Sequence, residues 1–279
     1  MALRIWAVIG CLVFVTGEVS VAALGEPFPL GLSMSNQGGV MDAEGALGRQ
    51  PWVPAAFLWD TISCGVAACG TAYYWGMEKN ASVLQYGAGG WLRRGRFVCK
   101  LSLVQFDALN VYYEQMIYVS VGLNYRFLGL SVDVKPCRMG LWGTDDARAL
   151  VTAAVTCLIR MGLVDLSLSA DELVVESSGT NGSDPYHSFK AGLYTRRNRY
   201  GTQGVLVQTV PHMSKPVRFV IAQEYRIGSS FAVSAALSSN PTMISFGIAV
   251  DFSPVSGGAA VVNHPVLGWS KGFSIDYSK

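Results

Sequence analysis

The sequence predicts an all-β fold, a closed antiparallel transmembrane β-barrel of about 12–14 strands. Hydrophobic residues make up 51% of the 279 residues and charged residues only 14%, against about 25% charged in typical soluble domains. The longest apolar stretch, residues 5–15, is too short for a spanning helix, which needs about 18–20 residues. Apolar residues instead alternate with small or polar ones along most of the chain, and this is the pattern of strands.

The N-terminus predicts export from the cytoplasm. Arg4, the apolar residues 5–15 and the small residues 20–23 have the order of a secretory signal peptide cleaved near Ala22 or Ala23. The alternative is an uncleaved anchor. We therefore expect three segments: a signal peptide over residues 1–23, a plug-like segment over 24–54 that is rich in Gly, Ser, Met and Pro, and the barrel over 55–279.

Alternation is clearest over residues 117–127, 130–135, 164–169 and from 217 to the end. Weaker segments fill the intervals, the first of them expected at residues 56–66. Two longer loops are expected, at residues 136–148 and 170–188, because both carry turn-forming and acidic residues.

The chemistry of the two strand faces separates a membrane barrel from a soluble sandwich. One face is Val, Ile, Leu and Phe, while the other is mostly Ser, Gly, Ala and Asn. A transmembrane barrel turns its large apolar side chains to lipid and lines its lumen with small and polar ones. We expect these residues to face lipid: Val217, Phe219, Ile221, Phe231, Val233, Ile244, Phe246, Ile248, Val250, Phe273 and Ile275. We expect these to face the lumen: Arg218, Glu224, Ser245, Gly247, Asp251, Ser274 and Asp276.

The last ninety residues resemble those of a family of outer-membrane proteins. The matching motifs are Glu224-Tyr225-Arg226-Ile227-Gly228, Asn240-Pro241, Ser245-Phe246-Gly247-Ile248 and His264-Pro265-Val266-Leu267-Gly268. They look like the last four strands of FadL-like and PorV-like barrels. Pro51-Trp52-Val53-Pro54-Ala55-Ala56 lies where such proteins have an Asn-Pro-Ala turn that opens the first strand, although the Asn is absent here. The chain also departs from the pattern by ending on Tyr277-Ser278-Lys279.

Charged residues on the small-residue face are candidates for the lumen. They are Arg126, Asp133, Asp165, Arg218, Glu224 and Arg226. They either line a narrow polar channel or form structural pairs in a filled lumen. A second set lies near expected hairpin turns and is a candidate for binding phosphates of lipopolysaccharide or lipid headgroups: Arg93, Arg94, Arg96, Arg196, Arg197 and Arg199. The alternative for this second set is solvated turn residues.

Catalytic and metal motifs have little support. The three histidines lack metal-ligand spacing, and no nucleophile elbow or phosphate loop occurs. The best enzyme-like cluster is Asn181, Ser183, Asp184 and His187, which also reads as an ordinary turn. A Cys64–Cys69 or Cys137–Cys157 disulfide is an alternative to reduced cysteines. We therefore expect no cofactor and no enzyme activity.

Function is predicted from the barrel and the resemblance. The leading hypothesis is a non-catalytic protein of the cell outer membrane, surrounded by outer-membrane lipid. It serves passive transport of small or hydrophobic compounds, or acts as a scaffold for secretion or surface-assembly proteins. The near-neutral net charge of +2 argues against nucleic acid as a partner. The alternatives are a soluble secreted β-sandwich or binding module and, third, an outer-membrane hydrolase.

Overall fold

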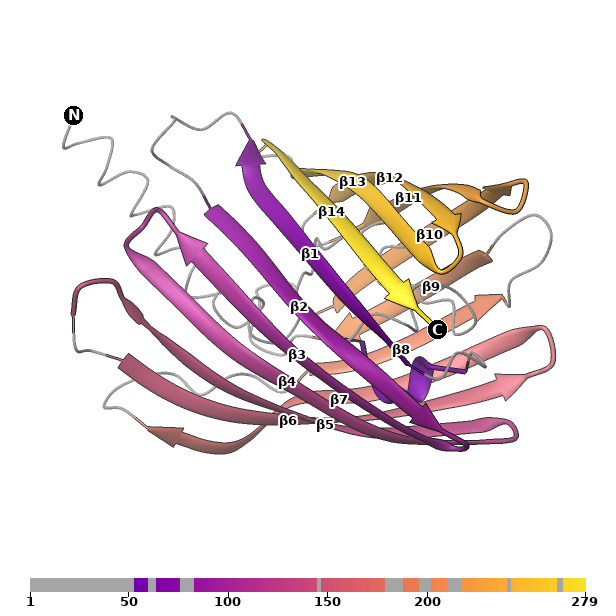
Figure 1. The fold of residues 1–279 in the computed structure, drawn as a ribbon, viewed down its shortest axis with the longest axis horizontal. Coiled ribbons are helices and arrows are strands. Elements are labelled where there is room, and N and C mark those ends of the chain that lie inside the picture. Colours follow the sequence, from indigo (N-terminus) through magenta and orange to yellow (C-terminus); the bar gives the residue numbers. More distant parts are fainter. Residues whose placement is uncertain are drawn as a thin grey trace.

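In the computed structural model the chain forms a closed barrel of 14 antiparallel strands, each hydrogen-bonded to its neighbours in the sequence, with β1 against β14 (Figure 1). The structure describes residues 53–59, 64–75, 83–144, 147–178, 188–195, 202–209, 217–239, 242–264 and 268–279. The strands are β1 (Cys64–Trp75), β2 (Val83–Arg94), β3 (Phe97–Ala108), β4 (Tyr112–Tyr125), β5 (Leu128–Leu141), β6 (Ala147–Met161), β7 (Val164–Ser178), β8 (Ser188–Thr195), β9 (Thr202–Thr209), β10 (Val217–Ile227), β11 (Phe231–Ser238), β12 (Met243–Phe252), β13 (Val255–His264) and β14 (Gly268–Ser278).

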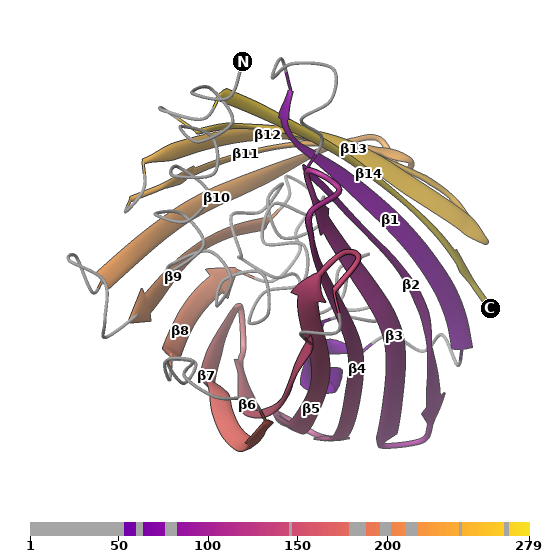
Figure 2. The same ribbon diagram turned by 90° about the vertical axis from the view of Figure 1, so that its left-hand side faces the viewer.

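The fold class and the strand number were therefore predicted correctly. The soluble sandwich is wrong, because one sheet closes on itself and the strands enclose a ring (Figure 2). Closure satisfies the backbone polar groups that an open sheet would expose to lipid. None of the described residues forms a helix long and apolar enough to cross a membrane.

The two ends of the barrel differ in their connections. At one end, called here the short-turn end, residues 95–96, 126–127, 162–163, 228–230 and 253–254 join neighbouring strands. The first and last strands meet there too, since the Cys64 amide donates to the Lys279 carbonyl at 3.1 Å. The opposite end, called here the loop end, carries longer connections, such as residues 76–82, 179–187 and 210–216.

The outer surface is apolar, as the alternation predicts. Phe219, Ile221, Phe246 and Phe273 are each at least 50% exposed although they lie in mid-strand. Their sequence neighbours on the other face are buried or half-buried, such as Ser245 at 5%. The full set of expected lipid-facing residues alternates with the expected lumen-facing set in this way over β10–β14. Exposure of large aliphatic and aromatic side chains over a whole surface is what a lipid environment requires.

Three expected boundaries are wrong. Residues 55–57 do not open the first strand: they form a single 3-10 turn, η1 (Ala55–Phe57), and β1 begins only at Cys64. Both expected long loops are shorter, because β5 continues to Leu141 and β7 to Ser178. The predicted signal peptide and almost all of the predicted plug lie outside the described residues.

Candidate functional site: the barrel lumen

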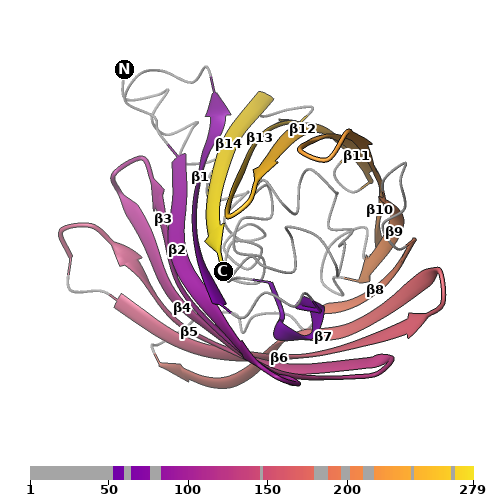
Figure 3. The ribbon, with the colours of Figure 1, turned by 45° about the vertical axis from the view of Figure 1, so that its right-hand side comes forward.

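An inner segment, residues 53–59, lies inside the ring of strands, where Figure 3 shows its indigo turn η1. It contacts β3, β4, β5 and β6. Two hydrogen bonds attach its backbone to β4: the Ala55 amide donates to Ser120 Oγ at 2.7 Å, and Asn124 Nδ2 donates to the Leu58 carbonyl at 2.6 Å. Both wall residues are at most 4% exposed. The inner segment is therefore docked on one side of the lumen, near the short-turn end.

Missing side chains in the wall make room for this docking. A Cβ on Gly122 would lie 2.8 Å from Ala55 Cβ, and one on Gly129 would lie 2.7 Å from the Ala56 carbonyl oxygen. These distances are shorter than real contacts, so only glycine allows the inner segment to lie this close.

The Arg160 side chain contacts the last residue of the inner segment, Trp59. The Arg160 guanidinium lies 4.6 Å from the ring centre of Trp59, which is cation–π range. Asp165 Oδ2 on β7 lies 3.7 Å from Arg160 Nε and forms an ion pair with the guanidinium. The Trp59 indole also donates to the Ala56 carbonyl at 2.7 Å, so its ring orientation is fixed.

From the level of Ser120 toward the loop end, five charged residues on β3, β5, β7 and β8 form a group called here the lysine–aspartate belt: Lys100, Asp133, Lys135, Asp171 and Lys190. Asp171 accepts from both Lys135, at 2.5 Å, and Lys190, at 3.2 Å. Lys100 is fully buried and interacts electrostatically with Asp133. Buried charges persist only when paired, and here the carboxylates of Asp133 and Asp171 offset the lysines of β3, β5 and β8.

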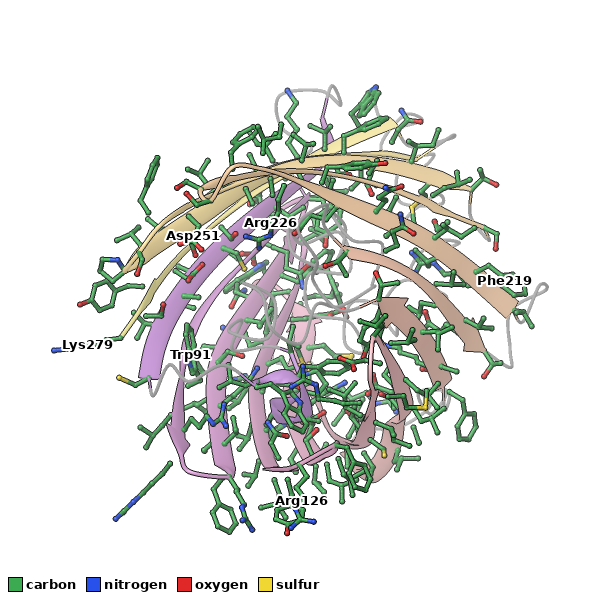
Figure 4. All side chains as sticks on the ribbon, turned by 90° about the vertical axis from the view of Figure 1, so that its right-hand side faces the viewer. Trp91, Arg126, Phe219, Arg226, Asp251 and Lys279 are labelled. Carbon is green, nitrogen blue, oxygen red and sulfur yellow. The ribbon has the colours of Figure 1, made fainter. Side chains whose placement is uncertain are left out.

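The predicted lumen candidates fall into two groups. Asp133, Asp165 and Glu224 are at most 9% exposed, and Arg218 and Arg226 are half-buried at inward positions of β10, the strand of Glu224. Arg226 Nε lies 3.4 Å from Glu224 Oε1. Figure 4 shows Arg226 pointing inward while Phe219, on the same strand, points out.

Arg126 was predicted wrongly as a lumen residue. It lies in the turn between β4 and β5, with a positive φ of 51°, and is exposed beyond the strands (Figure 4). Its guanidinium lies over the outward-facing Tyr125 ring at 5.3 Å. The alternation of residues 117–127 continues through the turn, so no break in the pattern marks the end of the strand.

Four charged residues of the belt were not among the candidates: Lys100, Lys135, Asp171 and Lys190. Lys100 and Lys135 do stand on the small-residue face of their strands, so the alternation contained the signal. Asp171 was hidden because residues 170–188 were assigned to a loop, whereas β7 carries Asp171 into the lumen opposite Ser188.

An aromatic cluster lies at the loop end of the lumen on β1 to β4. Tyr73 and Phe106 meet edge to face with ring centres 6.1 Å apart, and Phe106 meets Tyr112 in the same way at 6.4 Å. Val83 and Ala108 pack against them. Tyr112 donates to Glu114 at 2.7 Å, so its hydroxyl is satisfied. The cluster gives the loop end of the lumen an apolar, polarisable surface.

The candidates for headgroup contact lie at the short-turn end where the structure describes them. Arg93, Arg94 and Arg96 flank the turn between β2 and β3. Arg93 donates to the Gly95 carbonyl at 3.0 Å, and Arg96 lies 4.1 Å from the Tyr125 ring centre. Arg196, Arg197 and Arg199 lie outside the described residues.

The disulfide, metal and enzyme alternatives concern the cysteines, the possible metal ligands and the cluster around Ser183. The cysteines from Cys64 to Cys157 are free, and the members of each proposed pair point to opposite faces of the sheet. Among the described residues no group of His, Cys, Asp and Glu has the arrangement of a metal site. The Asn181, Ser183, Asp184 and His187 cluster lies outside them.

Comparison with known proteins relates the chain to solved barrels by fold. No family model and no curated protein matches the sequence. The CymD monoaromatic hydrocarbon channel superposes with a TM-score of 0.62 at 11% identity, covering 90% of this chain and 98% of that one. The toluene transporters TodX of Pseudomonas putida and TbuX of Ralstonia pickettii give 0.59 and 0.58, at 9% and 10% identity, each covering 89% of this chain and 97% of theirs. These likenesses bear out the predicted barrel fold, and the FadL-like and PorV-like family resemblance stays a prediction.

Proposed function

We propose that this chain is a channel of the outer membrane through which small hydrophobic compounds diffuse passively, without catalysis. The observation that carries the proposal is the closed 14-strand barrel, which matches a hydrocarbon channel and two toluene transporters over about nine-tenths of the chain. An 8-stranded barrel has room only for its own side chains, whereas 16–18 strands leave an aqueous channel. A 14-strand lumen that holds an inner segment leaves a restricted path. The scaffold role stays a prediction from the resemblance.

The two ends of the barrel give its orientation. Outer-membrane barrels place short turns in the periplasm and longer loops outside the cell. By this rule the short-turn end faces the periplasm, so the inner segment lies on the periplasmic side of the lumen and the aromatic cluster lies at the outer mouth. Compounds that enter from outside would meet apolar rings first and the docked segment last.

The orientation of the barrel also distinguishes between lipopolysaccharide and phospholipid headgroups as ligands of the arginines. Arg93, Arg94 and Arg96 lie at the short-turn end, which this orientation places at the inner leaflet. We therefore assign these arginines to phospholipid headgroups and not to lipopolysaccharide, which occupies the outer leaflet.

The proposal is tested by uptake into porin-deficient Gram-negative cells, whose lipopolysaccharide leaflet slows the entry of hydrocarbons. Cells expressing the chain should take up radiolabelled toluene faster than cells with an empty vector. Heat-modifiable migration of the protein on gels shows that it is folded in the membrane. A folded protein that leaves toluene uptake at the vector level would refute the proposal.

The predicted plug has its own test. Deleting residues 26–50 should raise toluene uptake above that of the full chain, because less of the lumen is then filled. Uptake unchanged by the deletion would mean that these residues do not obstruct the path.

A further inference from the structure

Two unpartnered polar groups lie side by side under the aromatic cluster. Thr71 on β1 stands directly opposite Gln85 on β2, and both face the lumen. Thr71 is 4% and Gln85 1% exposed, yet within the described part of the chain Thr71 Oγ1 and Gln85 Nε2 have no hydrogen-bond partner. A buried polar group without a partner costs about 1–3 kcal/mol. Such groups need a partner, which in a lumen is a water or a ligand.

A hydrogen bond from Tyr73 determines which donor and acceptor groups remain for a ligand. Tyr73 donates its hydroxyl to Gln85 Oε1, so the amide oxygen is satisfied and Nε2 is left as a donor. The Thr71 hydroxyl can accept or donate. Opposite residues in an antiparallel pair have Cβ atoms about 5 Å apart, so one ligand atom can reach both groups. A hydroxyl oxygen suits this pair, because it accepts from Gln85 and donates to Thr71.

The walls of the site are apolar. Gln85 stands opposite Phe106 on its other side, and the rings of Tyr73 and Tyr112 meet Phe106 edge to face. Neither Thr71 nor Gln85 carries a charge that would neutralise a carboxylate, and the next residue beyond Phe106 is the acidic Glu114. Burial of an unpaired anion here would be costly.

We propose that Thr71 and Gln85 form a selectivity site for an uncharged hydroxylated aromatic compound, which docks its ring against Tyr73 and Phe106. This inference rests on the proposed channel function and narrows its cargo from hydrocarbons in general to compounds with one hydroxyl. Two further unpartnered groups, Ser102 Oγ and Trp91 Nε1, lie lower on the same wall. They continue the path toward the short-turn end.

Phenol and toluene are the probes, because they differ only in a hydroxyl in place of a methyl. The ratio of their vector-corrected uptake rates in porin-deficient cells cancels differences in expression. Thr71→Val replaces the hydroxyl by a methyl of the same shape and breaks none of the hydrogen bonds described above. It should lower the phenol-to-toluene ratio about three- to tenfold, the value of one hydrogen bond, and leave toluene uptake unchanged.

Three more variants make the result specific. Gln85→Leu should lower the ratio in the same way, and Thr71→Ser, which keeps the hydroxyl, should preserve it. Thr202→Val is the matched control, since Thr202 on β9 is 3% exposed and its hydroxyl is also unpartnered, but it faces the lumen from another wall.

The outcomes separate this inference from the channel function. If the wild type carries neither compound, the channel function fails. If it carries toluene but not phenol, or if Thr71→Val and Gln85→Leu both keep the wild-type ratio, the selectivity site is wrong and the channel stands. A drop in Thr202→Val equal to that in Thr71→Val would also overturn the assignment to this wall. Should Thr71→Val fail to fold, the Gln85→Leu ratio decides.

Discussion

A single methyl group at Gly122 should release the inner segment. An alanine Cβ there would lie 2.8 Å from Ala55 Cβ, 3.1 Å from the Ala55 carbonyl carbon and 3.0 Å from the Leu130 carbonyl oxygen of the wall, whereas carbon atoms pack at about 3.5–4.0 Å. Ala55 must therefore retreat by about 1 Å. That movement stretches its 2.7 Å hydrogen bond to Ser120. Overpacking of this kind costs about 1–3 kcal/mol, which makes the undocked state about 5- to 150-fold more populated.

Single-channel conductance in planar bilayers measures this release directly. Gly122→Ala should open more often or to a higher level than the wild type, because the inner segment leaves the short-turn end. Ser131→Ala is the matched control: Ser131 lies directly opposite Gly122 on β5 and faces the same lumen, but the change adds no volume. Wild-type conductance in Gly122→Ala, or an equal rise in Ser131→Ala, would show that the contact with Ala55 does not hold the segment.

Three further substitutions test the charge pairs of the lumen wall, the lipid-facing surface and the contact between Arg160 and Trp59. Asp171→Asn leaves the buried Lys135 and the half-buried Lys190 without their shared carboxylate, so it should destabilise the barrel by about 3–5 kcal/mol, measured as a lower temperature for loss of the heat-modifiable band. Phe246→Lys should cost about 2–4 kcal/mol in urea unfolding from lipid vesicles if Phe246 faces the bilayer midplane, whereas Ser245→Lys, which points into the lumen, should cost less. Arg160→Gln removes the cation over Trp59 and should raise conductance less than Gly122→Ala does; no rise at all would assign Arg160 to the wall alone.

Most of the barrel could be predicted from the sequence, because a membrane strand requires a strict two-residue alternation of apolar and small or polar side chains. Phe246 and Ser245 face opposite media, and a shift by one residue would put apolar and polar side chains in the wrong places. The alternation of large apolar with small residues is therefore enough to identify the two faces of β10 to β14. Closure followed from the same pattern, since strands in lipid have no other way to pair their edges.

The lumen was harder to predict, because its contacts join residues far apart in the chain. Asp171 was assigned to a loop because its neighbour Glu172 is also acidic. Its burial is tolerable only through pairing with Lys135, 36 positions earlier, and with Lys190 on β8. Ala55 read as the start of a strand, since nothing local distinguishes a segment that enters the barrel from one that joins its wall. The glycines that receive it, Gly122 and Gly129, looked like ordinary small residues on a lumen face.

The distribution of charge in the lumen favours an uncharged cargo. On β5, β7 and β8 Asp171 binds both Lys135 and Lys190, so their charges are largely consumed in holding neighbouring strands together. A wall of paired charges presents a weaker field to a passing ion than the same charges unpaired. The wall of β1 and β2 at Thr71 and Gln85 instead offers neutral hydrogen-bonding groups beside aromatic rings. Selection along such a path depends on the shape of the compound and on single hydrogen bonds. These features distinguish phenol from toluene, which differ only in a hydroxyl in place of a methyl.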